Sequence, residues 1–226
     1  MNKPFFLFFI LVFSLSSKLL KAAPPGRIIP ANLSCELRIN PLGIDVATPD
    51  FNYIVIAANK GDRGLHQTAY QVLVASSPAL LKANTGDVWN SGKTLSDKTS
   101  FISYAGKPLQ SSHKYYWKIR VWDNNRVASA WSSQAHFTTG ILKEEDWKAA
   151  WIAAPWTAQP NRESFIARKS FAVKPNLVSA IIHISGLGHY EISVNGKKAG
   201  DELLAPGWTA YEKTILYNTY DITQQL

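Results

Sequence analysis

The chain has 226 residues, of which 46% are hydrophobic and 12% aromatic, and its formal net charge is +8 at pH 7. This composition excludes a disordered chain and provides enough apolar material for a buried core. The basic residues are scattered singly or in pairs such as Lys197-Lys198. Because nucleic-acid binding needs a basic stripe or a basic helix, we expect no nucleic-acid partner.

Residues 1–23 have the pattern of a signal peptide. Lys3 supplies the positive start, residues 5–15 form an apolar stretch, and Ala22-Ala23 offers small residues for cleavage. The apolar run is interrupted by serines and Lys18, well short of the roughly 20 residues of a spanning helix. We therefore expect a mature chain without a membrane span, exported to the periplasm or the cell exterior.

Cys35 is the only cysteine, so the chain has no internal disulfide. No histidine or basic residue is adjacent to it in the sequence. We expect Cys35 to be a small apolar residue in a strand rather than a nucleophile.

Residues 33–140 show the short strands and turn clusters of a β-sandwich. The strongest strand is Tyr115–Asp123, in which aromatic and branched apolar residues alternate. Leu109 lies six residues before Tyr115, a spacing similar to that of the tyrosine corner in fibronectin type III domains. These features predict a fibronectin III/Ig-like sandwich, and no segment of it has the periodicity of an amphipathic helix.

Residues 141–160 are expected to form a linker. Glu144-Glu145-Asp146 are three adjacent carboxylates, but calcium loops space their ligands with intervening residues and a tight glycine turn. A solvated turn is the favoured interpretation, with acid/base or calcium chemistry as the alternative. We expect Trp147 and Trp151 to pack one domain against the next.

Residues 161–226 predict a second, incomplete jelly-roll-like sandwich. Asn195-Gly196 is the residue pair that a two-residue type I′ hairpin favours. The expected strands fall at Ser164–Val173, Val178–Ser185, Tyr190–Val194, Lys198–Leu204 and Lys213–Tyr217. The whole chain is therefore predicted to be all-β, with an open strand edge in its second half.

The sequence motifs of both halves resemble those of the N-terminal sandwich region of bacterial α-L-rhamnosidases of glycoside hydrolase family 78. In the second half the resemblance rests on Gly-Leu-Gly at 186–188, Asn195-Gly196, Gly200-Asp201, Pro206-Gly207-Trp208 and the 217–223 segment. In the first half it rests on six segments in the family's order: 41–45, 67–75, 88–92, 104–106, 115–123 and 137–140. It spans roughly residues 36–223.

This resemblance implies an inverting glycosidase that removes terminal non-reducing α-L-rhamnose from rhamnosylated glycans or glycosides. Such enzymes need two carboxyl groups roughly 6.5–9.5 Å apart, and in the family these belong to an (α/α)6 barrel that these residues do not contain. No carboxylate here matches them, so we assign no catalytic residue. For the one acidic pair within a family motif, Asp201-Glu202, turn chemistry is favoured.

Direct sugar binding is the function that this chain could perform without the catalytic barrel. Aromatic rings stack on pyranose faces, and carboxylate or amide groups bind hydroxyls. The candidate sugar contacts at one edge of the second sandwich are Trp208, Tyr211, Asn195 and Asp201. The family resemblance also implies calcium as an optional ligand, because some family sandwiches bind rhamnose together with calcium. No zinc site is expected, because the five histidines have no ligand spacing.

Three hypotheses follow. The leading one is the N-terminal, non-catalytic part of an exported α-L-rhamnosidase. The alternatives are a stand-alone carbohydrate-binding module and a structural fibronectin-like spacer.

Overall fold

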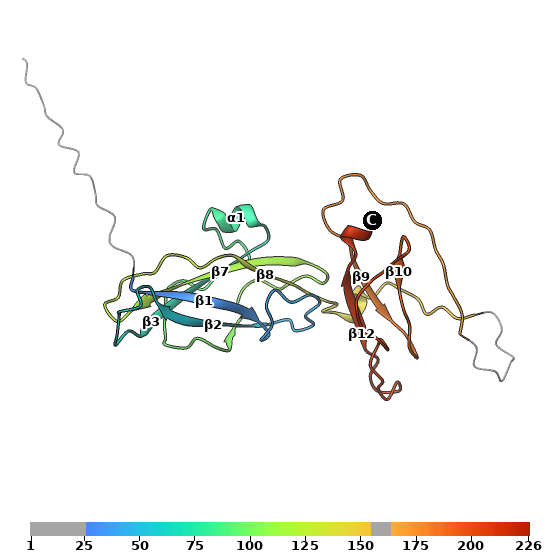
Figure 1. The fold of residues 1–226 in the computed structure, drawn as a ribbon, viewed down its shortest axis with the longest axis horizontal. Helices are drawn as coiled ribbons and strands as arrows, with labels where there is room; N and C mark the ends of the chain where they lie inside the picture. Colours follow the sequence, from blue (N-terminus) through green and yellow to red (C-terminus); the bar gives the residue numbers. More distant parts are fainter. Residues whose placement is uncertain (1–25, 155–163) are drawn as a thin grey trace, which may run out of the picture.

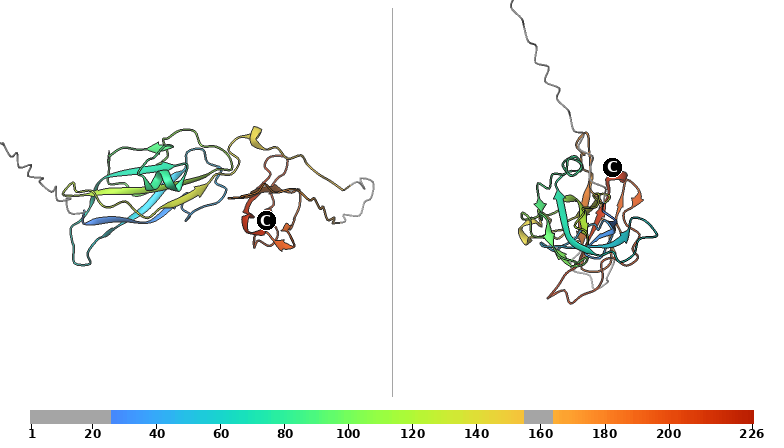
Figure 2. Two further views of the ribbon diagram at one scale, coloured as in Figure 1. Left: turned by 90° about the horizontal axis from the view of Figure 1, so that it is seen from above. Right: turned by 90° about the vertical axis from the view of Figure 1, so that its left-hand side faces the viewer.

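The computed structural model describes residues 26–154 and 164–226. The expected signal peptide at 1–23 and part of the expected linker at 141–160 lie outside these residues. The described chain forms two β units placed end to end (Figures 1 and 2), and the predicted all-β fold class is confirmed.

The first unit is a two-layer sandwich of antiparallel strands. One sheet has the order β1 (Ile28–Cys35), β2 (Asp50–Ala57) and β6 (Ile102–Ser103). The other runs β4 (Trp89–Asn90), β3 (Gln67–Ala75), β7 (Lys114–Asp123) and β8 (Ala135–Thr138), and β5 (Thr94–Leu95) also pairs with β3. This is the fibronectin III/Ig-like arrangement that the sequence predicts.

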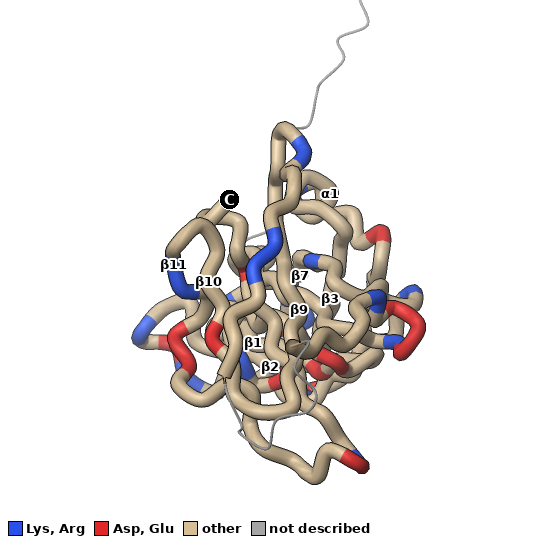
Figure 3. The backbone as a smooth tube through the Cα atoms, turned by 90° about the vertical axis from the view of Figure 1, so that its right-hand side faces the viewer, with Lys and Arg blue, Asp and Glu red and all other residues tan. Residues whose placement is uncertain are grey.

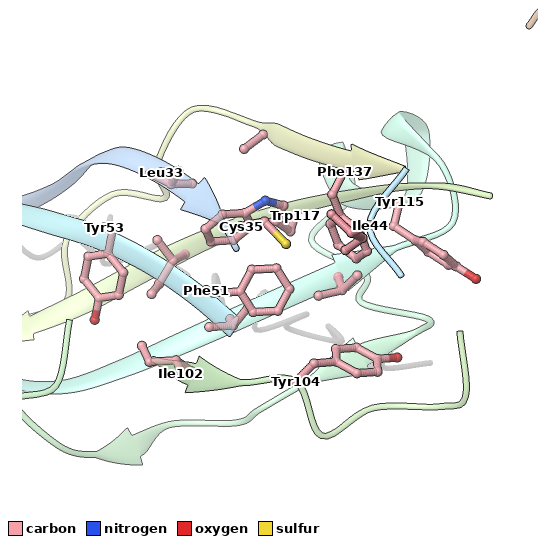
Figure 4. Packing of buried hydrophobic residues seen from close by; sticks show 14 of the residues in the cluster. Leu33, Cys35, Ile44, Phe51, Tyr53, Ile102, Tyr104, Tyr115, Trp117 and Phe137 are labelled. Carbon is pink, nitrogen blue, oxygen red and sulfur yellow. The ribbon is translucent and has the colours of Figure 1, made fainter. Parts of the chain in front are cut away.

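The core lies between the two sheets. The inward residues of β7 are Tyr115, Trp117, Ile119 and Val121, all at most 3% exposed, so the predicted alternation is confirmed. The Phe51 ring from the facing sheet lies 4.5 Å from the Trp117 ring (Figure 4). Aromatic packing of this kind supplies a large share of a sandwich core's stability.

Cys35 belongs to this core and is 1% exposed (Figure 4). Burial raises the pKa of its thiol far above the ordinary value, with smaller contributions from Glu36 and Asp50. A thiol that stays protonated is a poor nucleophile, so the expectation of an apolar packing residue is confirmed.

A short helix that the sequence does not predict covers the outer face of β3. Helix α1 (Pro78–Lys82) begins after Ser77, whose hydroxyl accepts a 3.3 Å bond from the Leu80 N–H. Leu81 packs on Leu73 and Ala75. With only five residues, α1 is too short to show helical periodicity in the sequence.

The predicted tyrosine corner is confirmed. The Gln110 N–H donates a 2.9 Å hydrogen bond to the hydroxyl oxygen of Tyr115. This bond fixes the start of β7 to the loop that precedes it.

The outer face of β7 carries a ladder of alternating cations and indole rings. The Arg120 guanidinium lies 5.0 Å from the Trp122 ring and 4.7 Å from the Trp131 ring. The Lys93 ammonium also lies over the Trp122 ring, at 4.8 Å, and Lys118 lies over Trp131. Cation–π contacts therefore accommodate the positive charges here, and neither of the two ion pairs among the described residues includes them.

The second unit contains two antiparallel strand pairs. These are β9 (Ile181–Ser185) with β12 (Tyr217–Asp221), and β10 (Ser193–Val194) with β11 (Lys197–Lys198). Short 3-10 helices occur at η1 (Glu144–Asp146), between the units, and at η2 (Thr223–Gln225). A small core of Ala199, Tyr220 and Ile222 holds the second unit together.

The strand predictions for the second unit are partly wrong. The 164–173 segment is exposed and forms no strand among the described residues, with Ile166 98% exposed. The last strand begins at Tyr217, where the sequence predicts its end. Apolar residues are present in both places, but a strand also needs a partner of matching register.

The predicted Asn195-Gly196 hairpin is confirmed. Val194 pairs with Lys197, and the two turn residues have φ values of 49° and 79°. Both dihedrals lie in the left-handed region that the type I′ turn requires.

Acidic and basic residues are interspersed on the face shown in Figure 3, with no continuous basic stripe there. Among the residues that the structure describes, no helix has the length and hydropathy to cross a membrane.

Candidate functional site

The two units meet at a junction that we define by seven residues. The first unit contributes Gly43, Ser112, Gly140 and Ile141, and the second contributes His183, Tyr217 and Thr219. In Figure 1 the end of the first sandwich faces β9 and β12.

Two glycines allow the units to approach closely. Gly43 has a φ of +75°, and a Cβ atom there would lie 2.6 Å from the Thr219 Oγ1 atom. A Cβ atom at Gly140 would clash with the Tyr217 hydroxyl. Any larger residue at these positions therefore has to push the second unit away.

Tyr217 is the central contact of the junction. Its hydroxyl oxygen accepts a 2.8 Å hydrogen bond from the Ile141 N–H. The Trp147 ring packs against the Tyr217 ring with centroids 5.7 Å apart, which confirms the predicted packing role of Trp147. The same prediction for Trp151 is wrong, because that residue is 60% exposed.

His183 links three parts of the junction. Its Nε2 atom lies 2.7 Å from the Ser112 hydroxyl and its Nδ1 atom 2.9 Å from the Thr219 hydroxyl, and the ring edge faces Tyr217. Burial lowers the pKa of His183. A neutral ring between two hydroxyls is a structural bridge, because each hydroxyl can donate or accept to suit the tautomer.

The three adjacent carboxylates lie in η1, beside the junction. Asp146 accepts a 2.6 Å hydrogen bond from the Ser111 hydroxyl, whereas Glu144 and Glu145 are exposed. Asp146 therefore serves to attach η1 to the first sandwich. The geometry favours the solvated turn over acid/base chemistry.

Asn195 and Trp208, two of the predicted sugar contacts, occupy separate neighbourhoods. The Asn195 side-chain amide donates a 2.7 Å hydrogen bond to the carbonyl of Gln225, the last residue of η2. Trp208 is 75% exposed, and its ring stacks on His189 at 5.4 Å with an interplanar angle of 19°. Trp208 thus keeps an open aromatic surface, while the Asn195 amide is engaged within the protein.

Tyr211 is half-buried and Asp201 is exposed, both in the loop between β11 and β12. Within the described part of the chain, no hydrogen bond or ring contact joins any two of the four predicted residues. The described residues also contain no group of three His, Cys, Asp or Glu side chains placed to hold a metal ion. Acidic side chains alone therefore do not build a calcium site in the described part.

Sequence reasoning missed the junction residues. Gly43 and Gly140 lie within the segments that resemble the rhamnosidase family, but a glycine in a β-sandwich usually indicates a turn. The need for glycine becomes visible only when the second unit is in place, because the colliding atoms lie more than 70 residues away in the chain.

The fold defines this chain as a fibronectin III/Ig-like sandwich followed by a smaller β unit of two antiparallel strand pairs. Residues 30–143 match the family described as "Rha78A-like, N-terminal immunoglobulin domain", and residues 175–226 match "Alpha-L-rhamnosidase N-terminal domain". The chain belongs to the N-terminal sandwich region of the α-L-rhamnosidases.

Individual relatives agree with this assignment. An α-L-rhamnosidase of Formosa agariphila is 37% identical over 83% of this chain, and one of Alteromonas sp. (strain LOR) is 37% identical over 82%. The chain spans 22% and 21% of the length of these two relatives.

Solved structures give the same result. The α-L-rhamnosidase of Dictyoglumus thermophilum is 36% identical with a TM-score of 0.77, over 88% of this chain and 24% of that one. The Streptomyces avermitilis α-L-rhamnosidase, solved with L-rhamnose, is 29% identical with a TM-score of 0.53, over 88% of this chain and 21% of that one.

Proposed function

We propose that this chain is the N-terminal, non-catalytic region of an exported α-L-rhamnosidase of glycoside hydrolase family 78. The whole enzyme removes terminal non-reducing α-L-rhamnose from rhamnosylated glycans or glycosides. Its acid and base belong to a barrel domain outside these residues. The observation that carries the proposal is the match of both sandwiches, in order, to the N-terminal domains of α-L-rhamnosidases.

The junction supports a bracing role for this region. Packing through Gly43, Gly140 and Tyr217 fixes the second sandwich relative to the first. Two sandwiches in a fixed relative orientation give a catalytic domain a rigid support beside its substrate entrance. Domains joined only by a flexible linker have no fixed relative orientation.

A second candidate function is carbohydrate binding by the second sandwich itself. The exposed ring of Trp208 favours it, since aromatic surfaces stack on pyranose rings. Tyr211 and Asp201 lie in the same loop and would add polar contacts. In this candidate, calcium binds only together with the sugar.

The experiment is hydrolysis of p-nitrophenyl α-L-rhamnopyranoside by the complete gene product, beside the α-D-glucoside and the β-D-galactoside. The proposal predicts turnover of the rhamnoside, at least about tenfold above the other two, and secretion of the product from the host cell. Preference for another glycoside would contradict the assigned activity. Retention in the cytoplasm would contradict the assigned export.

A further inference from the structure

An open hollow of about 480 Å³ lies on the outer side of the domain junction. Its wall combines the outer face of β7 with the residues before β9, the end of β12 and η2. The lining residues are Lys114, Tyr116, Val178, Ser179, Asp221, Thr223, Gln224 and Gln225. This volume falls within the roughly 300–1,000 Å³ of small-molecule sites, which often occur between domains.

Several polar groups of the hollow have no partner within the described protein. The Asp221 Oδ1 atom accepts bonds from the Thr223 N–H and hydroxyl at 3.0 and 2.5 Å, and no hydrogen bond or ion pair engages Oδ2. Lys114 forms no ion pair within the described residues. The Gln225 Oε1 atom is buried without a hydrogen-bond partner. A buried oxygen without a partner among the described residues is uncommon, so Gln225 Oε1 calls for a ligand or a solvent molecule. The exposed Asp221 carboxylate and the partly exposed Lys114 are open to a ligand.

The charge of the hollow is mixed. Burial alone would raise the pKa of Asp221, but the Thr223 bonds and the charge of Lys114 hold it below its ordinary value, so the carboxylate is ionised at neutral pH. An anionic ligand would meet this carboxylate, and a cationic one would meet Lys114. A neutral ligand with many hydroxyl groups can donate hydrogen bonds to the Asp221 carboxylate and accept them from the Lys114 ammonium, without charge repulsion.

Tyr116 adds an aromatic wall. It is half-buried on the outer face of β7, with its ring 6.3 Å from that of His136. One aromatic wall beside a cation, a carboxylate and amides suits a pyranose ring, whose C–H face is apolar and whose rim is polar.

The hollow is also preformed. Its two walls come from different units, and the Tyr217–Ile141 bond and the His183 bridge hold these units together. A ligand that binds here therefore does not have to pay for ordering the two domains first.

We propose that this junction hollow is a saccharide subsite that binds a neutral α-L-rhamnoside through Lys114, Tyr116, Asp221 and Gln224. The choice of rhamnoside rests on the proposed function. The subsite is distinct from the Trp208 loop, because its residues lie on β7, before β9, at the end of β12 and in η2.

The test is titration of the purified chain with methyl α-L-rhamnopyranoside, followed by amide NMR shifts, with glycerol as a comparison solute. Saturable shifts are expected in residues 114–116 and 221–225. Gln224→Ala and Lys114→Ala each remove one hydrogen-bonding group and should weaken binding about fivefold. Gln224 is exposed, and no hydrogen bond or ion pair within the described structure engages either side chain.

Trp208→Ala is the matched control and should leave this binding unchanged. Absence of saturable shifts, equal shifts with glycerol, or loss of binding in Trp208→Ala alone would overturn the subsite. The hydrolysis assay on the complete gene product separates the two proposals. Rhamnoside turnover without binding by this chain refutes only the subsite, and absence of turnover refutes the proposed function.

Discussion

The hydroxyl oxygen of Tyr217 accepts a 2.8 Å hydrogen bond from the backbone N–H of Ile141, and this bond ties β12 to the segment that leaves the first sandwich. Gly140, one residue earlier, has no side chain, and a Cβ atom there would occupy the place of the hydroxyl. The phenol of Tyr217 thus fits against a glycine backbone and, with the His183 bridge, holds the two units in place.

Replacing Tyr217 by Phe tests this contact. The Ile141 N–H loses its acceptor, so we expect the free energy of unfolding to fall by about 1–2 kcal/mol. Interdomain motion should increase in NMR relaxation. Tyr211→Phe is the control, because the Tyr211 hydroxyl has no hydrogen-bond partner in the described structure. Equal behaviour of the two variants would show that the hydroxyl does not hold the junction.

Gly43→Ala tests the close approach of the units. The added methyl group meets the Thr219 side chain, so residual dipolar couplings should report a changed orientation of the second sandwich. Gly92→Ala is a matched control, because Gly92 also has a positive φ, of 62°, but nothing lies within 4 Å of its added Cβ. Both variants carry the same backbone strain of about 1 kcal/mol. An unchanged orientation in Gly43→Ala would contradict the tight junction.

Tyr115→Phe tests the tyrosine corner. The Gln110 N–H loses its partner, and we expect a loss of about 1–2 kcal/mol of unfolding free energy in urea titrations. The neighbouring Tyr116→Phe removes a hydroxyl that has no hydrogen-bond partner among the described residues, and it should cost less than about 0.5 kcal/mol. A similar loss in both variants would mean that the corner bond adds nothing.

Asp123 makes the stability of the first sandwich depend on pH. Burial would raise its pKa, but backbone N–H groups of Val127, Arg27 and Asn125 donate to the carboxylate and bring the pKa below its ordinary value. The unfolded chain therefore binds this proton more readily. The contribution of Asp123 is complete above about pH 4 and is lost as the pH falls through the pKa of the folded state.

We expect Asp123→Asn to cost about 2 kcal/mol at pH 7 and to flatten the decline in stability below pH 4. Thermal melts of both proteins between pH 7 and pH 2 provide the measurement. An unchanged acid slope in the variant would contradict this role for Asp123.

The sequence predicts the structure best where a feature depends only on residues close together in the chain. The alternation of 115–121 predicts the buried face of β7, and the Leu109–Tyr115 spacing predicts a bond between residues close in the chain. Asn195-Gly196 predicts its hairpin because the turn requirement is local.

Contacts between distant segments were not predictable in this way. The apolar segment 164–173 lacks a partner strand within the described structure, and β12 begins where the sequence predicts its end. Of the predicted sugar contacts, Asn195 is held by Gln225 and Trp208 by His189, which a linear pattern does not reveal. The junction glycines depend on atoms of the other unit, so only the assembled chain shows their role.

The most direct test of the central claim is hydrolysis of p-nitrophenyl α-L-rhamnopyranoside by the purified chain alone, with calcium present and with a thermal melt of the same sample. We expect a cooperative melt from the first sandwich and no turnover above the buffer rate. Turnover by the folded chain would contradict the non-catalytic role. It would then require an acid and base among Glu144, Glu145, Asp146, Asp201 and Glu202.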